Sequence, residues 1–208
     1  MESGANPAGG HVPLIGLIGP IGSGKSSVAG FLAARGAIVI DADKLTHEMM
    51  APGTPLEAAI LTHFGAEYRR PNGSLDRQAL GRLVFSDPDR LAELESIVHP
   101  AINERLARLV LESNARHPRA VVIEAIKLVE AGHAAGCDEI WLVVCDPQTQ
   151  LARLVGRGMD PADARQRIAA QGASLPLWRS AATRVIDTEG SLAEVEREVD
   201  AALSSSIG

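Results

Sequence analysis

The sequence predicts an α/β fold in which a five-stranded parallel sheet carries a large helical insertion. Short apolar runs alternate with helical patterns towards both ends of the chain. Near the N-terminus a strand, a helix and a second strand fit within about 28 residues, which is typical of a βαβ unit and hence of a parallel sheet. Roughly 75 residues with helical spacing follow, far more than a crossover needs, so we expect them to form an insertion beside the sheet.

The first βαβ unit supplies two strands and one helix. The apolar run 13–18 ends in glycine and proline, as a buried strand stopped by turn residues does. Residues 25–35 place their apolar side chains on one helical face, and a glycine follows as a C-cap. The run 37–40 is a second apolar strand, which Asp41 closes.

The insertion and the rest of the sheet follow from the same periodicities. Helical spacing is expected over 56–64, 75–85, 88–98 and 101–111, and a Pro-Asn-Gly-Ser turn separates the first two of these segments. The remaining strands are expected over 120–123, 140–145 and 184–186. Asp146-Pro147 and Asp160-Pro161 each begin a helix, the second running to about residue 171, and an amphipathic helix over 191–203 closes the chain.

Composition and charge exclude several function classes. The 208 residues include 20 Lys+Arg and 26 Asp+Glu, so the formal charge is 20 − 26 = −6, and 46% of residues are hydrophobic. This is ordinary globular usage, which argues against a disordered or collagen-like chain. A general nucleic-acid or membrane-surface binder would need a basic field. Aromatic residues make up only 3%, which argues against a base-stacking platform.

The cysteines and the N-terminus point to a cytoplasmic protein. Cys137 and Cys145 are too few for a disulfide framework or a zinc site, and Cys145 is expected to be a small buried side chain. No apolar stretch approaches the length of a membrane span. Residues 1–11 lack the basic region of a signal peptide and are expected to form a flexible tail.

The segment that carries chemistry matches the phosphate-binding pattern Gly-x4-Gly-Lys-Ser/Thr. It reads Gly19-Pro20-Ile21-Gly22-Ser23-Gly24-Lys25-Ser26, with a strand before it and a helix after it. Glycines let backbone N–H groups turn inward around an anion, and the helix adds its positive end. Lys25 would reach the β- and γ-phosphates, and Ser26 would offer its hydroxyl to Mg²⁺.

Three kinds of nucleotide-using protein remain open: a small-molecule kinase, a GTPase switch and a motor-type ATPase. A GTPase needs a guanine-reading Asn/Thr-Lys-x-Asp string, which the sequence lacks. An ATPase needs an apolar strand that ends in a catalytic Asp. Asp146 superficially fits that place, but the following proline favours a helix N-cap. The order of strand, loop, helix, strand and Asp, then a helical insertion and an Arg-rich segment, favours the kinase.

Carboxylates and arginines supply the other candidate site residues. Asp41 and Asp43 follow the second strand, where ligands of doubly wound sheets bind; Asp41 could be a helix cap, and Asp43 could accept the proton of an attacking hydroxyl. Arg153 and Arg157, four residues apart around a Gly-Arg-Gly break, could stabilise a transferring phosphoryl group from a closing lid.

Over residues 13–202 the chain resembles the dephospho-coenzyme A kinase family. The resemblance is carried by the loop with Ser27 after it, by Asp-Ala-Asp at 41–43, and by His-Pro at 99–100. Further marks are His63-Phe64-Gly65, Gly73-Ser74-Leu75-Asp76-Arg77, Val84-Phe85-Ser86-Asp87-Pro88, Gln150-Leu151-Ala152-Arg153 and Val185-Ile186-Asp187.

The resemblance implies a P-loop nucleotide kinase-like fold, the cofactors ATP and Mg²⁺, and phosphoryl transfer to the ribose 3′-hydroxyl of dephospho-CoA. It places the base on Asp43 and the lid-side arginine on Arg153. The nucleotide would be held by Gly22, Ser23, Gly24, Lys25, Ser26, Ser27 and Arg157, and the metal by Ser26 and Glu124. The expected organisation is a core over 12–44 and 118–203 with a lid at about 153–172, and a dephospho-CoA-binding insertion over 45–117.

Some positions depart from the family pattern, and alternatives stay open. Ile18-Gly19-Pro20 replaces the usual Thr-Gly-Gly, Lys127 stands at a normally apolar position, and Thr188 stands where the family often has Asn near the base. Lys127 could contact phosphate or lie on the surface. The alternatives are a kinase for another small acceptor, such as a nucleoside monophosphate, and an ATPase or switch module. No nucleic-acid or membrane partner is expected, and a monomer is favoured.

Overall fold

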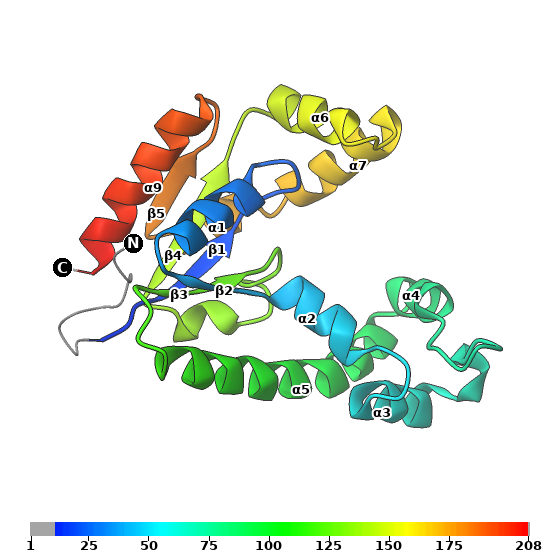
Figure 1. The fold of residues 1–208 in the computed structure, drawn as a ribbon. Coiled ribbons are helices and arrows are strands. Elements are labelled where there is room, and N and C mark those ends of the chain that lie inside the picture. The colour runs from blue at the N-terminus through cyan, green and yellow to red at the C-terminus, as the bar shows by residue number, and fades with distance from the viewer. Residues whose placement is uncertain (1–10, 208) are drawn as a thin grey trace. The chain divides into compact units, whose positions relative to one another are not determined.

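The computed structural model describes residues 11–207, which fall into two compact units (Figure 1). The core unit comprises residues 11–41 and 110–207, and the helical unit comprises residues 42–109. The flexible tail predicted over 1–11 lies, apart from His11, outside the described residues.

The core unit is built on a five-stranded parallel sheet, as predicted from the sequence. The strands are β1 (Leu14–Ile18), β2 (Ile38–Asp41), β3 (Val121–Glu124), β4 (Glu139–Val144) and β5 (Arg184–Asp187). Their order is β2-β3-β1-β4-β5, and every neighbouring pair is parallel. The chain therefore crosses from one side of β1 to the other after β3, so the carboxyl end of β1 lies at the switch point where such sheets bind ligands.

Helices α1 (Lys25–Ala34) and α9 (Leu192–Ser206) pack against one face of this sheet and against each other (Figure 1). Their buried side chains, such as Leu32 and Val199, join Leu17, Trp141 and Ile186 in one apolar cluster. Alternate strand residues contribute to it because successive side chains point to opposite faces. This cluster fixes the first turn of α1, and with it the loop that precedes the helix.

The opposite face is closed in part by α8 (Leu175–Ala181), which the sequence analysis did not anticipate. Its Trp178 is buried and donates its indole N–H to Glu130 Oε1 at 3.0 Å. Seven residues that begin Leu-Pro contain too few helical repeats for periodicity to reveal them. The helix is therefore held by one buried aromatic anchor rather than by a sequence pattern.

Two helices follow β4, namely α6 (Pro147–Gly156) and α7 (Pro161–Gly172). Both begin as predicted, with Asp146 and Asp160 as N-caps whose carboxylates accept backbone N–H bonds of the first turn. The N-cap role of Asp146 removes the observation that suggested a motor-type ATPase.

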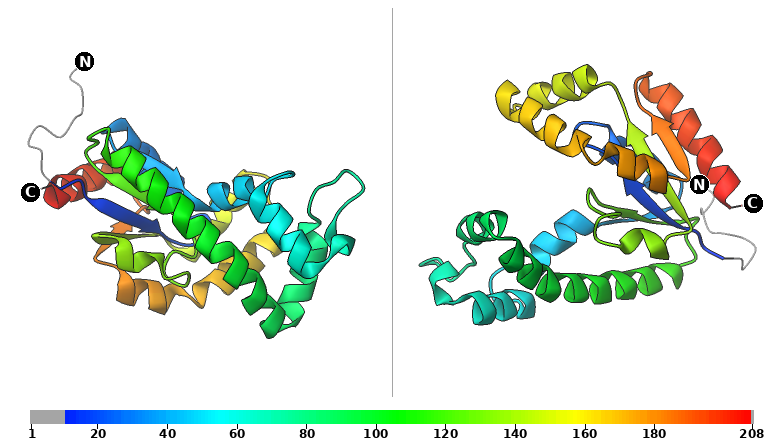
Figure 2. Two further views of the ribbon diagram at one scale, coloured as in Figure 1. Left: turned by 90° about the horizontal axis from the view of Figure 1, so that it is seen from below. Right: turned by 180° about the vertical axis from the view of Figure 1, so that it is seen from behind.

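The helical unit contains α2 (Ala42–Met49), α3 (Pro55–Phe64), α4 (Arg77–Ser86) and most of α5 (Pro88–Asn114); short 3₁₀ turns lie at Ala66–Tyr68 here and at His133–Gly136 in the core unit. The helix α2 was not anticipated. The prediction of two separate helices over 88–98 and 101–111 is wrong, because the single helix α5 continues through Pro100 (Figure 2). Proline removes one helical hydrogen bond. The buried Ile102 and Leu106 keep the second half in the same helical phase.

A buried carboxylate organises the start of α3. Glu57 is 2% exposed. Its Oε2 accepts the Gly53 N–H at 2.7 Å, and its Oε1 accepts the Leu75 N–H at 2.8 Å. One side chain therefore joins the turn before α3 to the segment before α4.

We expect Glu57→Ala to lower the free energy of unfolding by about 2–4 kcal/mol, because it leaves two backbone N–H groups without acceptors in a buried place. Glu57→Gln retains one acceptor oxygen and should lose less. Urea denaturation measures both variants against Glu95→Ala, an exposed position on α5. Equal stabilities of Glu57→Ala and Glu95→Ala would contradict the assigned role.

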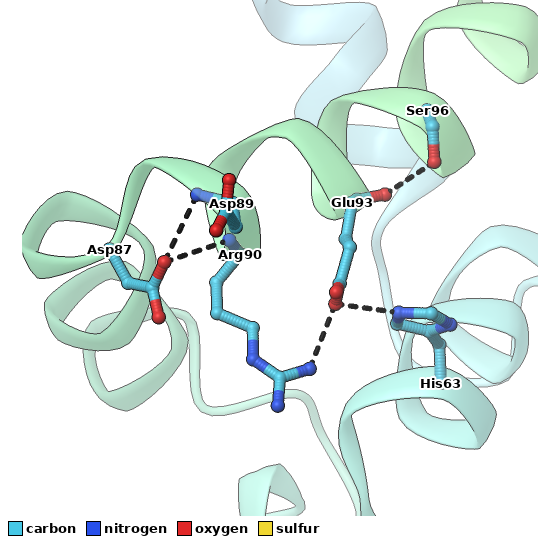
Figure 3. A network of polar contacts seen from close by, with 6 residues as sticks. All are labelled: His63, Asp87, Asp89, Arg90, Glu93 and Ser96. Carbon is cyan, nitrogen blue, oxygen red and sulfur yellow. Dashed lines mark hydrogen bonds and ion pairs between the residues drawn. The ribbon is translucent and has the colours of Figure 1, made fainter.

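A polar network ties α3 to the first turns of α5 (Figure 3). Glu93 Oε2 lies 2.9 Å from His63 Nε2 and 2.9 Å from Arg90 Nη1. Hydrogen bonds from His63 and Arg90 hold the pKa of the Glu93 carboxyl below its ordinary value. The network is solvent-exposed, so it orients the two helices more than it stabilises them.

Within residues 11–207, no helix is both long enough and apolar enough to cross a bilayer.

Candidate active site

The phosphate-binding loop connects β1 to α1 at the carboxyl edge of the sheet. Gly24 is the N-cap of α1 with φ of 95°, a left-handed conformation that favours glycine. At Gly19 a Cβ would lie 2.3 Å from the Val143 carbonyl oxygen, so only glycine lets the loop pass β4 this closely. The conformation of the loop therefore depends on glycine at these two positions.

The loop encloses a cavity of about 140 Å³. Its lining consists of Pro20, Ile21, Gly22, Ser23, Gly24, Lys25 and Ser26 from the loop, together with Ile126 and Arg157. Lys25 Nζ donates to the Gly19 carbonyl oxygen at 2.9 Å, so the ammonium lies across the loop. An ammonium, a guanidinium and the positive end of α1 converge here, which makes the cavity a site for a multiply charged anion.

The two arginines proposed from the sequence occupy different places. Arg157, exposed just after α6, lines the loop cavity. Arg153 donates through Nη1 to Thr188 Oγ1 at 2.9 Å and through Nη2 to the Thr188 carbonyl oxygen at 2.6 Å. A longer bond of 3.4 Å joins Arg153 to the Gly22 carbonyl oxygen. Arg153 thus braces the outer side of the loop, whereas Arg157 faces the anion site.

Thr188 is a structural part of this brace. It is 3% exposed, and its hydroxyl donates to the Ser23 carbonyl oxygen at 2.6 Å while accepting from Arg153. Its polar group is therefore used within the protein. The Ser23 hydroxyl, by contrast, is buried without a hydrogen-bond partner in the described structure, so the loop keeps one unused polar group close to the anion site.

Gln171 is a loop contact that the sequence analysis missed. The Ile21 N–H donates to Gln171 Oε1 at 2.6 Å, which joins the loop to α7 across 150 positions of sequence. A lone glutamine on a polar helix gives no local signal, so only the fold reveals it. Because the donor is a backbone N–H, the carboxamide oxygen must face the loop.

We expect Gln171→Leu to raise the KM for the nucleotide up to about tenfold, because it leaves a loop N–H without its acceptor and the loop less well positioned. The KM for the acceptor should not change. Steady-state kinetics with each substrate varied in turn separates the two effects. Gln166→Ala, an exposed glutamine on the same helix, is the matched control. Equal nucleotide KM values for both variants would remove Gln171 from the site.

Two carboxylates meet at the same edge of the sheet. Asp41 and Glu124 are register partners at the ends of β2 and β3, and Glu124 is level with Leu17 just before the loop. Adjacent strands lie about 4.8 Å apart, so these side chains begin close together. The described residues contain no cluster of three His, Cys, Asp or Glu side chains that could hold a metal alone. Mg²⁺ usually binds through one or two carboxylates plus substrate phosphates, which this donor set fits.

Asp43 belongs to the helical unit. It lies exposed in the first turn of α2, which begins directly after Asp41, the last residue of β2. It shares one face of α2 with His47, four residues further on. The helix therefore fixes the direction of the Asp43 side chain relative to the rest of the helical unit.

The two cysteines and Lys127 are not among the residues that line the loop cavity. Burial, with Asp138 nearby, raises the pKa of the Cys137 thiol to about 11. Burial also raises the pKa of Cys145, whose Sγ lies 3.7 Å from the Gly22 carbonyl oxygen. Cys145 is half-buried, not fully buried as expected. Lys127 is exposed and does not line the loop cavity.

Comparisons with known proteins agree on one family. The family model for dephospho-CoA kinase matches residues 13–194. A dephospho-CoA kinase of Symbiobacterium thermophilum is 46% identical over 94% of this chain and 82% of its own length. The corresponding protein of Geobacter metallireducens is 45% identical over 89% of this chain and 92% of its own.

Solved structures give the same fold. A protein of Thermus thermophilus called TT1252 superposes with a TM-score of 0.76 and 34% identity, covering 94% of this chain and 98% of its own. A shikimate kinase from Acinetobacter baumannii, at 16% identity and a TM-score of 0.55 over 95% and 96% of the two chains, shares the fold. The fold is thus that of P-loop kinases. The family model matches most of the chain, and the relatives from Symbiobacterium thermophilum and Geobacter metallireducens are 46% and 45% identical to it. The chain therefore belongs to the dephospho-CoA kinase family.

Proposed function

We propose that this protein transfers the γ-phosphoryl group of ATP to the ribose 3′-hydroxyl of dephospho-CoA, which gives coenzyme A. The observation that carries the proposal is family membership over residues 13–194, and the loop cavity inside that span has a lysine and an arginine in place. The fold and the cavity alone would also suit other small-molecule kinases.

Phosphoryl transfer depends mainly on positioning and on charge stabilisation. In this proposal the loop N–H groups and Lys25 hold the β- and γ-phosphates, and Arg157 stabilises charge on the transferring group. Arg153, bound to Thr188 and Gly22, positions the loop. Arg157 thus takes the part that the resemblance assigned to Arg153.

Asp43 is the proposed base that orients and deprotonates the 3′-hydroxyl. Transfer requires this carboxylate to come within hydrogen-bonding reach of an alcohol that lies in line with the γ-phosphate. The lid expected over 153–172, which contains Arg157 and Gln171, would exclude water as a competing acceptor.

Ser26 and Glu124 are the residues that we propose for Mg²⁺, directly or through a water molecule, and Asp41 joins them as the register partner of Glu124. When bound, Mg²⁺ would neutralise phosphate charge. We further propose that the insertion expected over 45–117 binds the acceptor. A cytoplasmic location and a monomeric state stay predictions from the sequence.

The direct test incubates the purified protein with ATP, Mg²⁺ and dephospho-CoA, and identifies coenzyme A by mass spectrometry. Parallel reactions replace dephospho-CoA by each nucleoside monophosphate, or omit the acceptor. Coenzyme A formation supports the proposal. Phosphorylation of a monophosphate only, or ATP hydrolysis that no acceptor affects, would replace it by another kinase or by an ATPase.

A further inference from the structure

Glu189, the second residue after β5, holds the start of α6 from outside the loop cavity. Its Oε2 accepts the Asp146 N–H at 3.0 Å, and its Oε1 accepts a hydrogen bond from the Thr149 hydroxyl. Asp146 is the N-cap of α6, and Thr149 lies in the first turn of that helix. The bonds from Thr149 and Asp146 hold the pKa of the Glu189 carboxyl below its ordinary value, and the positive end of the helix favours the same charge.

The segment that carries Glu189 is itself fixed to the sheet. The Glu189 N–H donates to Asp187 Oδ1 at 2.8 Å. The Thr188 N–H donates to the Val144 carbonyl oxygen at 3.0 Å, which continues the pairing of β4 with β5 by one residue. The backbone of Glu189 is therefore positioned by the sheet, and its side chain joins that fixed point to α6.

Thr188 and Glu189 hold two successive turns of α6. Glu189 binds Thr149, and Thr188 binds Arg153, which lies one helical turn further on. Arg157 follows after another turn and lines the loop cavity, so Thr149, Arg153 and Arg157 form a row along one side of the helix. A helix that is held at one point can pivot about it, whereas two points about 6 Å apart along its axis fix its direction.

The direction of α6 matters because the helix lies directly against the phosphate-binding loop. At Gly22 a Cβ would lie 3.0 Å from the Gln150 carbonyl oxygen and 3.2 Å from Leu154 Cγ, so there is no spare room between helix and loop. Thr149 and Arg157 are eight residues apart, about 12 Å along the axis. A small rotation at the start of the helix therefore becomes a larger displacement of Arg157 at its end.

We infer that Glu189 is a positioning residue for phosphoryl transfer: it holds the first turn of α6 and thereby fixes where Arg157 meets the transferring group. Glu189 is not among the residues that line the loop cavity, and its negative charge would repel a phosphate. Its contribution is therefore made through the helix and not by contact with the nucleotide. The inference rests on the proposed function, which gives Arg157 its role.

The test is a double-mutant cycle on the full-length protein. We expect Glu189→Ala to lower kcat for coenzyme A formation about threefold to tenfold, the effect of losing exposed hydrogen bonds to a charged group, without changing the KM for dephospho-CoA. In an Arg157→Ala background the same substitution should lower kcat less than about twofold, because no guanidinium is left to position. Glu198→Ala, which removes a carboxylate from α9 instead, is the matched control.

A conservative variant and a measurement without substrate complete the test. The carboxamide of Glu189→Gln can accept the Asp146 N–H through its oxygen and donate to the Thr149 hydroxyl oxygen through its nitrogen, so this variant should keep kcat within about twofold of the wild type. Hydrogen exchange followed by mass spectrometry should show faster exchange of the amides of residues 147–157 in Glu189→Ala than in Glu189→Gln.

The outcomes separate positioning from other roles of Glu189. An equal fold-loss of kcat in the wild-type and Arg157→Ala backgrounds would show that Glu189 does not act through Arg157, and would overturn the inference. Unchanged exchange over residues 147–157 in Glu189→Ala would overturn it as well. A wild-type protein that forms no coenzyme A would instead contradict the proposed function, and the exchange measurement would still decide whether Glu189 holds α6.

Discussion

Replacement of Lys25 by alanine is expected to lower turnover on the order of a thousandfold or more. The Lys25 ammonium donates to the Gly19 carbonyl oxygen and lines the loop cavity, so its positive charge lies where the phosphates are proposed to bind. Removing it deletes a full positive charge from a site where charge builds up on the γ-phosphate during transfer. The Arg157 guanidinium remains in the cavity lining, but it comes from the end of α6 and not from the loop.

The measurement is the initial rate of coenzyme A formation at saturating ATP and dephospho-CoA. Lys127→Ala is the matched control, because this lysine is exposed and does not line the cavity. Circular dichroism should show both variants folded, because neither lysine belongs to the apolar cluster between α1, α9 and the sheet. A Lys25→Ala enzyme that keeps wild-type turnover would discredit the loop as the phosphate site.

The parts of the fold that could be predicted are those whose signal is local. The phosphate-binding loop is recognisable from eight consecutive residues, and each strand of the sheet is a short apolar run. The helix α5 shows the limit of that approach, because Pro100 is a local stop signal that buried side chains further along override. The helix α8 shows the same limit, because it is too short for a helical pattern in the sequence and is anchored by the single buried Trp178.

The same distinction applies to the candidate site. Spacing places Arg153 and Arg157 on one side of a helix, but only the structure shows that Thr188 engages the first and that the second lines the cavity. Gln171 and Ile21 are 150 positions apart, and no single-sequence pattern links such residues. The place of Asp43 after the second strand suggested a proton acceptor, and the resemblance to a family assigned it the role of base. The structure adds that Asp43 belongs to the helical unit.

Asp43→Asn is expected to lower turnover by roughly two to four orders of magnitude while leaving the KM for ATP nearly unchanged. The amide keeps the size of the side chain and can still accept a hydrogen bond from the 3′-hydroxyl, but it cannot take up the proton. The nucleotide is proposed to bind in the core unit, whereas Asp43 belongs to the helical unit, so loss of the carboxylate should affect the chemical step and not nucleotide binding. The measurements are kcat with dephospho-CoA and nucleotide affinity by calorimetry.

Two further readouts separate a base from other uses of the carboxylate. If Asp43 held the metal, Asp43→Asn would raise the Mg²⁺ concentration needed for half-maximal rate, and excess Mg²⁺ would restore activity; a lost base cannot be restored in that way. Asp89→Asn, an exposed carboxylate in the first turn of α5, controls for the change in net charge. Full turnover in Asp43→Asn would remove Asp43 from the chemistry.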